Sequence, residues 1–220
     1  MSVDDDILKV ASERLNAEAD AVRALIPTLD ASFIRAASLL VSCRGKVLIG
    51  GSGTSGTVAR RMAHVFSVSG TPSLFLSPMD SLHGASGAIT PDDTVLLISN
   101  GGASDEVIKA ARIAARRGAA VIALTRSHET PLARIADHSC VVAVDRRAEL
   151  GGVIATGVTL AQSAWGDALA EVLMRGRGYT WAEFMSTHPA GAVGQLDELP
   201  RDFAPLSIPA LDDRKETQHD

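Results

Sequence analysis

Five short apolar runs, each bounded by Gly, Ser or Pro, constrain the fold of this chain more than any other feature. Their length suits strands that are buried on both faces of a sheet. Segments with apolar residues at helical spacing separate the runs, and such alternation predicts a parallel sheet with helices on both sides. We therefore expect an α/β fold, a three-layer αβα sandwich around a five-stranded parallel sheet, with strands at 47–49, 73–76, 94–98, 120–124 and 140–144 and helices at about 55–68, 104–117 and 130–136.

Helical patterns also flank this alternating region. Two helices are expected before it, at 4–26 and 30–43, because a proline ends the first and Asp30 suits the N-cap of the second. A long helix at about 152–176 and a short helical turn at 181–184 are expected after it. We divide the chain into N-terminal helices that pack on the domain (1–45), one ligand-binding domain (46–196) and a polar C-terminal tail (197–220).

Composition and charge argue against several classes of protein. The net charge is −5 and no run of Lys or Arg is longer than a pair, so we expect no nucleic-acid partner. The four lysines all lie outside the Gly-rich loops, which argues against Schiff-base enzymes and Walker-type ATPases. The longest apolar stretch, 151–174, is interrupted by charged residues, so we expect no membrane span. Two cysteines and an acidic N-terminus predict a cytoplasmic protein.

Two Ser/Gly-rich loops follow the first and third predicted strands, and each leads into a helix. At the carboxyl ends of parallel strands, helix N-termini present free N–H groups to anions. Glycines let the backbone approach an oxyanion, and hydroxyl groups add donors. We expect these loops to hold a phosphorylated small molecule through Gly51, Ser52, Gly53, Thr54 and Ser55 in the first and Ser99, Asn100, Gly101, Gly102 and Ser104 in the second.

Two other interpretations of the loops stay open at this point. Both loops are also compatible with ordinary tight turns, where Gly and Ser are common. Gly51, Gly53 and Gly56 fit the pattern G-x-G-x-x-G of nicotinamide-dependent oxidoreductases. That interpretation requires an acidic residue at the end of the second strand, whereas Asp80 lies beyond it. A pair of hydroxyl-bearing loops favours a small phosphate ester over an extended dinucleotide.

Four further motifs accompany the two loops: His83-Gly84-Ala85-Ser86-Gly87, Thr90-Pro91-Asp92-Asp93, Trp165-Gly166-Asp167-Ala168-Leu169-Ala170 and His188-Pro189-Ala190-Gly191-Ala192-Val193-Gly194. In this order, over about residues 5–196, the chain resembles the SIS (sugar isomerase) domain of arabinose-5-phosphate isomerases. The resemblance implies a flavodoxin-like or Rossmann-like fold, a sugar-phosphate ligand and aldose–ketose isomerisation. The family's regulatory CBS domains would begin near residue 205, and we expect the chain to lack them.

Aldose–ketose isomerisation moves a proton between adjacent carbons through an enediolate, and so it requires a base and groups that exchange protons with the oxygens. No metal or organic cofactor is required. Glu106, in the first turn after the second loop, is the expected base, with His83 and His188 as acid/base groups. The resemblance implies that the segment with His188 reaches the site of a neighbouring subunit, in a homodimer or homotetramer. The alternative roles are a glutamate that complements a helix dipole and histidines that serve packing.

Two positions depart from the family. Thr54 stands where the relatives carry a lysine, and Arg147 where an ungapped comparison places another active-site glutamate. Glu149, two residues on, is the expected replacement for that glutamate. These departures leave the substrate open, with D-ribulose 5-phosphate and D-arabinose 5-phosphate as the first pair to consider. They also keep a rival hypothesis open, a non-catalytic module that senses a sugar phosphate.

Overall fold

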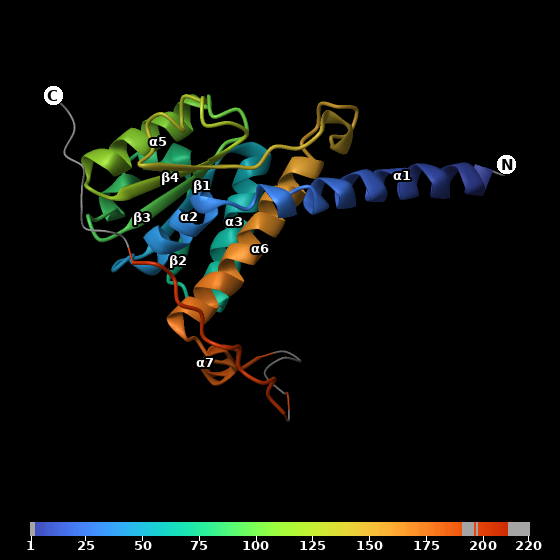
Figure 1. Cartoon of the computed structure of the whole chain (residues 1–220). Helices are drawn as coiled ribbons and strands as arrows, with labels where there is room; N and C mark the ends of the chain where they lie inside the picture. Colours follow the sequence, from blue (N-terminus) through green and yellow to red (C-terminus); the bar gives the residue numbers. More distant parts are fainter. Residues whose placement is uncertain (1–2, 191–195, 197, 211–220) are drawn as a thin grey trace.

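A computed structural model describes residues 3–190, 196 and 198–210 of the chain. At its centre lies an all-parallel sheet of five strands in the order β2-β1-β3-β4-β5, with helices on both faces (Figure 1). The predicted αβα sandwich is therefore confirmed. The strands are β1 (Val47–Gly51), β2 (Ser73–Leu76), β3 (Thr94–Ile98), β4 (Ala120–Thr125) and β5 (His138–Val141).

Alternate side chains of the central strands enter two separate cores, because successive residues of a strand point to opposite faces. Ile49 and Leu96 belong to one core, and Leu48 and Leu97 belong to the other. All four are at most 3% exposed. The first core lies beneath α2 (Ala31–Val41), α3 (Gly53–Val68) and α6 (Gly157–Arg177). The second core lies beneath α5 (Asp105–Arg116). The short helix α4 (Pro78–Leu82) packs against α5 and is followed by η2 (Ala85–Ala88).

The N-terminal helix α1 (Val3–Arg23) projects from the body of the molecule (Figure 1). Its main contacts are with α6 and with the short helix η3 (Arg146–Ala148). The short helix η1 (Ile26–Thr28) then leads into α2, where the Asp30 carboxylate accepts a hydrogen bond from the Ser32 N–H, 2.8 Å long. Asp30 is therefore the N-cap, as predicted. The division of the chain at residues 45 and 196 remains a prediction.

The fifth strand and one predicted helix differ from the sequence-based expectation. β5 begins at His138, two residues before the predicted run, because its ladder with β4 starts at the Ile122–His138 pair. The segment 130–136 forms turns instead of a helix. Its Leu132 N–H donates to the Gly102 carbonyl, 2.9 Å away, and not to a carbonyl of a preceding helical turn. Within the segment only separated hydrogen bonds of the i→i−4 type form, so no regular helix is built over these few residues.

The last long helix starts later than the pattern predicts. α6 begins at Gly157 rather than near residue 152, because Gly151 and Gly152 have φ of +63° and +69°, outside the right-handed helical region. It ends at the left-handed Gly178, close to the predicted end. A short helix, α7 (Trp181–Ser186), follows where a helical turn was expected.

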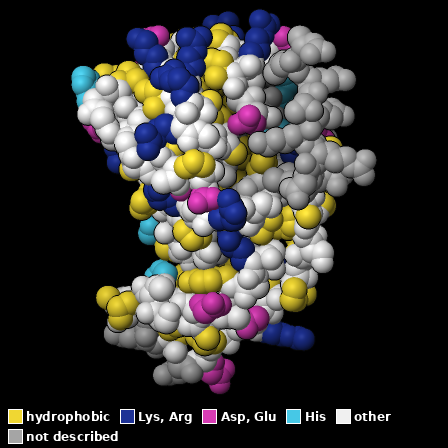
Figure 2. Space-filling view, turned by 90° about the vertical axis from the view of Figure 1, so that its left-hand side faces the viewer, with side chains coloured by type: hydrophobic (Ala, Val, Ile, Leu, Met, Phe, Trp, Pro, Cys, Tyr) yellow, Lys and Arg dark blue, Asp and Glu magenta, His cyan; other side chains and the backbone are white. Residues whose placement is uncertain are grey.

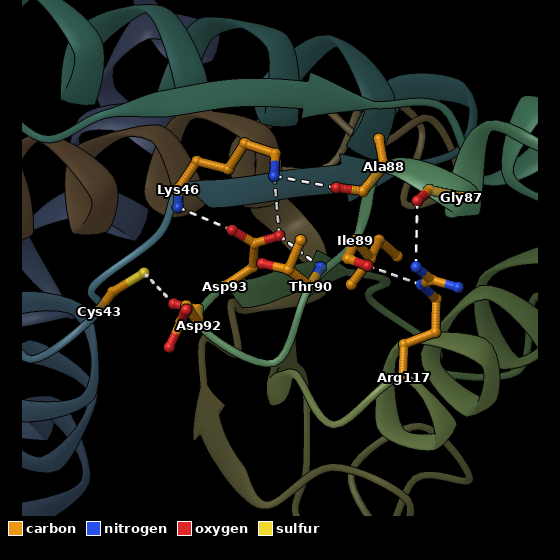
Figure 3. A network of polar contacts seen from close by, with 9 residues as sticks. All are labelled: Cys43, Lys46, Gly87, Ala88, Ile89, Thr90, Asp92, Asp93 and Arg117. Atoms are coloured by element: carbon orange, nitrogen blue, oxygen red, sulfur yellow. Dashed lines mark hydrogen bonds and ion pairs between the residues drawn. The ribbon is translucent and has the colours of Figure 1, made fainter.

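A polar network joins β1 and β3 at the edge of the sheet where these strands begin (Figure 3). The Asp93 carboxylate is 1% exposed and accepts from the Lys46 ammonium at 2.8 Å, the Lys46 N–H at 2.9 Å and the Thr90 N–H at 2.7 Å. The Lys46 ammonium also donates to the Ala88 carbonyl, 2.9 Å away. Residues 90–93 of the sequence motif therefore have a structural function at this edge.

The surface in Figure 2 is of mixed character: Lys and Arg side chains gather at one end, with acidic and hydrophobic side chains among them. Within the described part of the chain, no single helix is long and apolar enough to cross a membrane. By length and composition only, the pair Val3–Thr28 and Ala31–Val41, bent by 86°, passes that test.

Candidate functional site

The two Ser/Gly loops meet where the strand order reverses. β1 and β3 are neighbours, and Gly51 at the end of β1 pairs with Ile98 at the end of β3. From β1 the chain goes to β2 on one side, and from β3 it goes to β4 on the other. In open parallel sheets, ligands bind at this topological switch point, beyond the carboxyl ends of the strands.

The first loop places its hydroxyl groups around the N-terminus of α3. A Cβ on Gly51 would lie 2.8 Å from the Ser55 carbonyl oxygen, and one on Gly56 would lie 2.8 Å from the Gly51 oxygen, so only glycine permits this close turn. Ser52 is the N-cap of α3, yet its side chain makes no capping hydrogen bond. N–H groups at the start of α3 are thus free for an anion. Of the predicted residues here, Gly53 and Thr54 are exposed, and Ser52 and Ser55 are half-buried.

The second loop is held in shape by hydrogen bonds and by one glycine. The Gly102 N–H donates to the hydroxyl and the carbonyl of Ser99, at 3.1 and 3.0 Å. Gly102 has a φ of +61°, and a side chain there would overlap that of Thr130. Ser104 is the N-cap of α5 and makes no capping hydrogen bond, while its hydroxyl lies 3.4 Å from that of Ser99. A second helix N-terminus is therefore available at this edge, beside Asn100 and the exposed Gly101.

Glu106 and His83 lie on elements that pack together. Glu106 is half-buried in the first turn of α5, and its carboxylate makes no hydrogen bond or ion pair with the described residues. His83 is exposed at the C-terminus of α4, which packs against α5. Both residues thus lie on elements that cover the same face of the sheet, and Glu106 directly follows the second loop.

His188 lies at the opposite edge of the sheet within one chain. α6 runs alongside α3 in the same direction, because Gly166 lies against Met62 and Gly70 lies against Tyr179. α7 therefore follows at the edge where the strands begin, far from the loop that precedes α6 (Figure 1). The His188 ring stacks on Phe184 with 3.8 Å between ring centroids. The structure does not bring His188 to Glu106 of the same chain, and residues 191–194 of its motif lie outside the described residues.

Glu149 has a structural partner at both carboxylate oxygens. Oε2 accepts from the Thr156 N–H at 2.6 Å and Oε1 accepts from the Val158 N–H at 3.1 Å. The carboxylate thus caps the N-terminus of α6. Arg147 forms a bidentate pair with Asp145, at 3.0 Å for both bonds, and its side chain is 89% exposed. Its hydrogen bonds to Asp145 lower the pKa of that carboxyl group to about 2.

A cavity of about 510 Å³ adjoins the second loop and contains two arginines that sequence analysis missed. It is lined by Asn100, Arg126, Arg146 and Glu149, together with small and apolar residues of the segment 143–155. Arg126 comes directly after β4, so the rule that ligands bind at strand carboxyl ends was the signal that would have found it.

The described residues contain no group of three or more His, Cys, Asp or Glu side chains that would hold a metal ion.

Comparisons with known proteins agree with this geometry. Residues 39–172 match the family model of the SIS domain. The arabinose 5-phosphate isomerase KdsD of Pseudomonas aeruginosa is 35% identical over 195 residues, which are 89% of this chain and 60% of that protein. The chain thus spans about 60% of the length of this curated relative.

Two solved structures share the fold over most of the chain. An E. coli CFT073 protein in complex with arabinose 5-phosphate has a TM-score of 0.82 and 32% identity, over 86% of this chain and 100% of that one. A putative sugar-phosphate isomerase of Listeria monocytogenes has a TM-score of 0.81 and 29% identity, with the same coverage of both chains. With the family model, these matches confirm the resemblance in the sequence: the chain belongs to the SIS domain family.

Proposed function

We propose that the protein is a sugar-phosphate isomerase that interconverts an aldose and a ketose. One observation carries the proposal: two helix N-termini without side-chain caps meet at the switch point of the sheet, and Glu106 lies in the first turn of one of them. The uncapped N–H groups and the loop hydroxyls suit a phosphate dianion. A half-buried carboxylate without a partner among the described residues suits a base.

The proposed chemistry assigns one role to each group. Glu106 removes the proton from C2 of the open-chain aldose, the C–H electrons form a C1–C2 double bond, and the carbonyl electron pair moves to O1. The resulting enediolate takes the proton back at C1, while O2 loses its proton and becomes the ketose carbonyl. His83 and His188 exchange protons with the two oxygens and assist ring opening. No cofactor takes part in these steps.

The first substrates to test are D-arabinose 5-phosphate and D-ribulose 5-phosphate. The names of the relatives support this choice: a 35% identical protein is called arabinose 5-phosphate isomerase, and a 32% identical structure contains arabinose 5-phosphate. We place this activity in the cytoplasm, where thiols such as Cys43 and Cys140, both free in the structure, stay reduced.

Glu106→Gln tests the mechanism most directly. In D₂O, the wild type is expected to exchange the C2 hydrogen of its substrate, and Glu106→Gln is expected to lose this exchange by a factor of at least about 100 while it still binds the phosphate ester in a thermal-shift assay. Asp105→Asn is the matched control, because Asp105 is 75% exposed and pairs with Lys109. Undiminished exchange in Glu106→Gln would remove Glu106 from the mechanism. If the wild type binds pentose and tetrose phosphates but turns none of them over, the rival hypothesis of a non-catalytic module that senses a sugar phosphate would be favoured.

We further propose a homodimer or homotetramer in which His188 completes the site of a neighbouring subunit. The position of His188 at the far edge of its own sheet supports this arrangement. The helix α1 also supports it, because exposed apolar surface is unfavourable in water and would be buried between subunits. Its apolar residues with at least 62% exposure are Val3, Ile7, Leu8, Val10 and Leu15.

Mixed oligomers test the shared site. Glu106→Gln and His188→Ala are each expected to be inactive as pure oligomers. In a random mixture of the two, half of the dimers carry one site with both wild-type residues, so activity is expected to return to about a quarter of the wild-type level. A mixture that stays inactive, or a monomer in sedimentation at micromolar concentration, would contradict the proposal.

A further inference from the structure

The cavity beside the second loop carries an excess of positive charge. Arg126 and Arg146 line it, and Glu149 is the one acidic side chain among its lining residues. Both oxygens of Glu149 accept hydrogen bonds from the first turn of α6, so its charge is largely compensated by a helix N-terminus. The two guanidinium groups are therefore the uncompensated charges of the cavity.

Both arginines have guanidinium donors that are free of partners among the described residues. The Arg126 N–H donates to the Asn100 carbonyl, 3.0 Å away, and the Arg126 guanidinium has no hydrogen-bond or ion-pair partner among the described residues. The Nε of Arg146 donates to the Gly152 carbonyl at 3.0 Å, which leaves its terminal nitrogens free of such partners within the same part of the chain. Gly152 has a φ of +69°, and a Cβ there would lie 3.0 Å from Nε of Arg146. Glycine thus lets this arginine lie along the loop.

The cavity and the proposed phosphate site share one residue. Asn100 belongs to the second loop and also lines the cavity. A ligand whose phosphate lies between the two loops would therefore direct its other end past Asn100, toward the arginines. In the proposed isomerisation that end carries C1 and C2, where the negative charge of the enediolate develops.

We propose that Arg126 and Arg146 bind the anionic end of the sugar opposite its phosphate. This inference rests on the proposed function and adds two binding residues to it. Guanidinium groups suit planar oxyanions such as an enediolate or a carboxylate, because their N–H donors match two oxygens at once. A sugar phosphate with a carboxylate at C1 is consequently the class of ligand that the cavity is expected to prefer.

The test compares two ligands that differ only at C1. The 5-phosphate of D-arabinonic acid, which carries a C1 carboxylate, is expected to bind the wild-type protein at least about ten times more tightly than D-arabinose 5-phosphate, as measured by calorimetry. Arg126→Gln is expected to remove most of this preference, and Arg126→Gln combined with Arg146→Gln is expected to abolish it. The affinity of Arg126→Gln for D-arabinose 5-phosphate should differ less than about threefold from that of the wild type, because this sugar has no charge at C1 and loses only one weak contact.

Arg147→Gln is the matched control, because it removes the same charge next to Arg146 from a side chain that pairs with Asp145 and does not line the cavity. This variant is expected to bind the 5-phosphate of D-arabinonic acid more tightly than D-arabinose 5-phosphate, as the wild type does. Equal binding of both ligands to the wild type, or an equal loss of preference in Arg147→Gln, would overturn the inference. Its failure is distinguishable from that of the proposed function: absence of turnover leaves an arginine-dependent preference intact, and turnover without such a preference refutes the arginine subsite alone.

Discussion

Lys46 and Asp93 form an ion pair of 2.8 Å at the beginning of β1 and β3, with Asp93 1% and Lys46 30% exposed. The pair lies at the edge of the sheet opposite the candidate site, yet it fixes the two strands whose other ends carry the Ser/Gly loops. A substitution that breaks this ion pair is therefore expected to reduce the stability of the fold without a direct effect on the binding of a phosphate ester.

Asp93→Asn is expected to lower the free energy of unfolding by about 2 kcal/mol, because it leaves the half-buried Lys46 ammonium without its counterion and replaces an acceptor by a donor. Urea denaturation of both proteins at neutral pH measures the difference. Asp92→Asn serves as the control, because Asp92 pairs with Arg44 at an exposed position. An equal loss in both variants would show that the buried pair has no special contribution.

The pH dependence of stability follows from the same carboxylate. Burial raises the pKa of Asp93, but the hydrogen bonds from Lys46 and Thr90 outweigh burial and hold the pKa below its usual value. Its contribution is therefore complete above the pKa of the unfolded state, about 3.9, and is lost as the pH falls through the lower pKa of the folded state. Denaturation at several pH values should show a constant difference in the free energy of unfolding between wild type and Asp93→Asn above about pH 5, and a shrinking difference as the pH falls from about 4 toward about 2. If the difference in the free energy of unfolding between the two proteins grew toward acid pH, the lowered pKa of Asp93 would be refuted.

Gly102→Ala is expected to displace the second loop, because the residue has a φ of +61° and its new methyl group would overlap Thr130. We expect a loss of about 2 kcal/mol in stability and weaker binding of phosphate esters in a thermal-shift assay. Gly101→Ala is the control for stability, since a Cβ there would meet no atom within 4 Å. Equal melting temperatures of the two variants would contradict the prediction.

Glu149→Gln is expected to destabilise the protein by about 1 kcal/mol, because an amide offers one acceptor where the carboxylate accepts from both Thr156 and Val158, and because the negative charge at the start of α6 is lost. Chemical denaturation measures this loss. The exposed Glu129, paired with Arg134, provides a comparison whose Gln variant should change stability by less than about 0.5 kcal/mol. Unchanged stability together with abolished turnover would instead assign Glu149 to the reaction.

Cys140 is expected to resist alkylation in the folded protein. It is 1% exposed, and burial raises the pKa of its thiol to about 12, so the reactive thiolate is scarce at neutral pH. Cys43 is partly exposed and is expected to react first. Iodoacetamide labelling at about pH 8, followed by mass spectrometry, distinguishes the two thiols. Faster labelling of Cys140 would mean that β5 opens readily.

The sequence alone determined the layers of the fold and the family. Short apolar runs such as 94–98 predict buried strands by local pattern, and the glycines and hydroxyl residues of both loops lie close together in the chain. Local patterns also located the N-cap Asp30 and the end of α6 near Gly178. These features depend on neighbouring residues, so they are readable without tertiary contacts.

The tertiary structure decided which distant residues meet. Leu132, in the turns of residues 130–136, bonds to Gly102, and Glu149 became a helix cap because the loop before α6 folds back on it. Arg126 and Arg146, 20 positions apart in the sequence, line one cavity with Asn100, whereas the sequence-predicted His188 lies at the other edge of the sheet. Such pairings follow from strand order and loop closure over many residues, which no local pattern encodes.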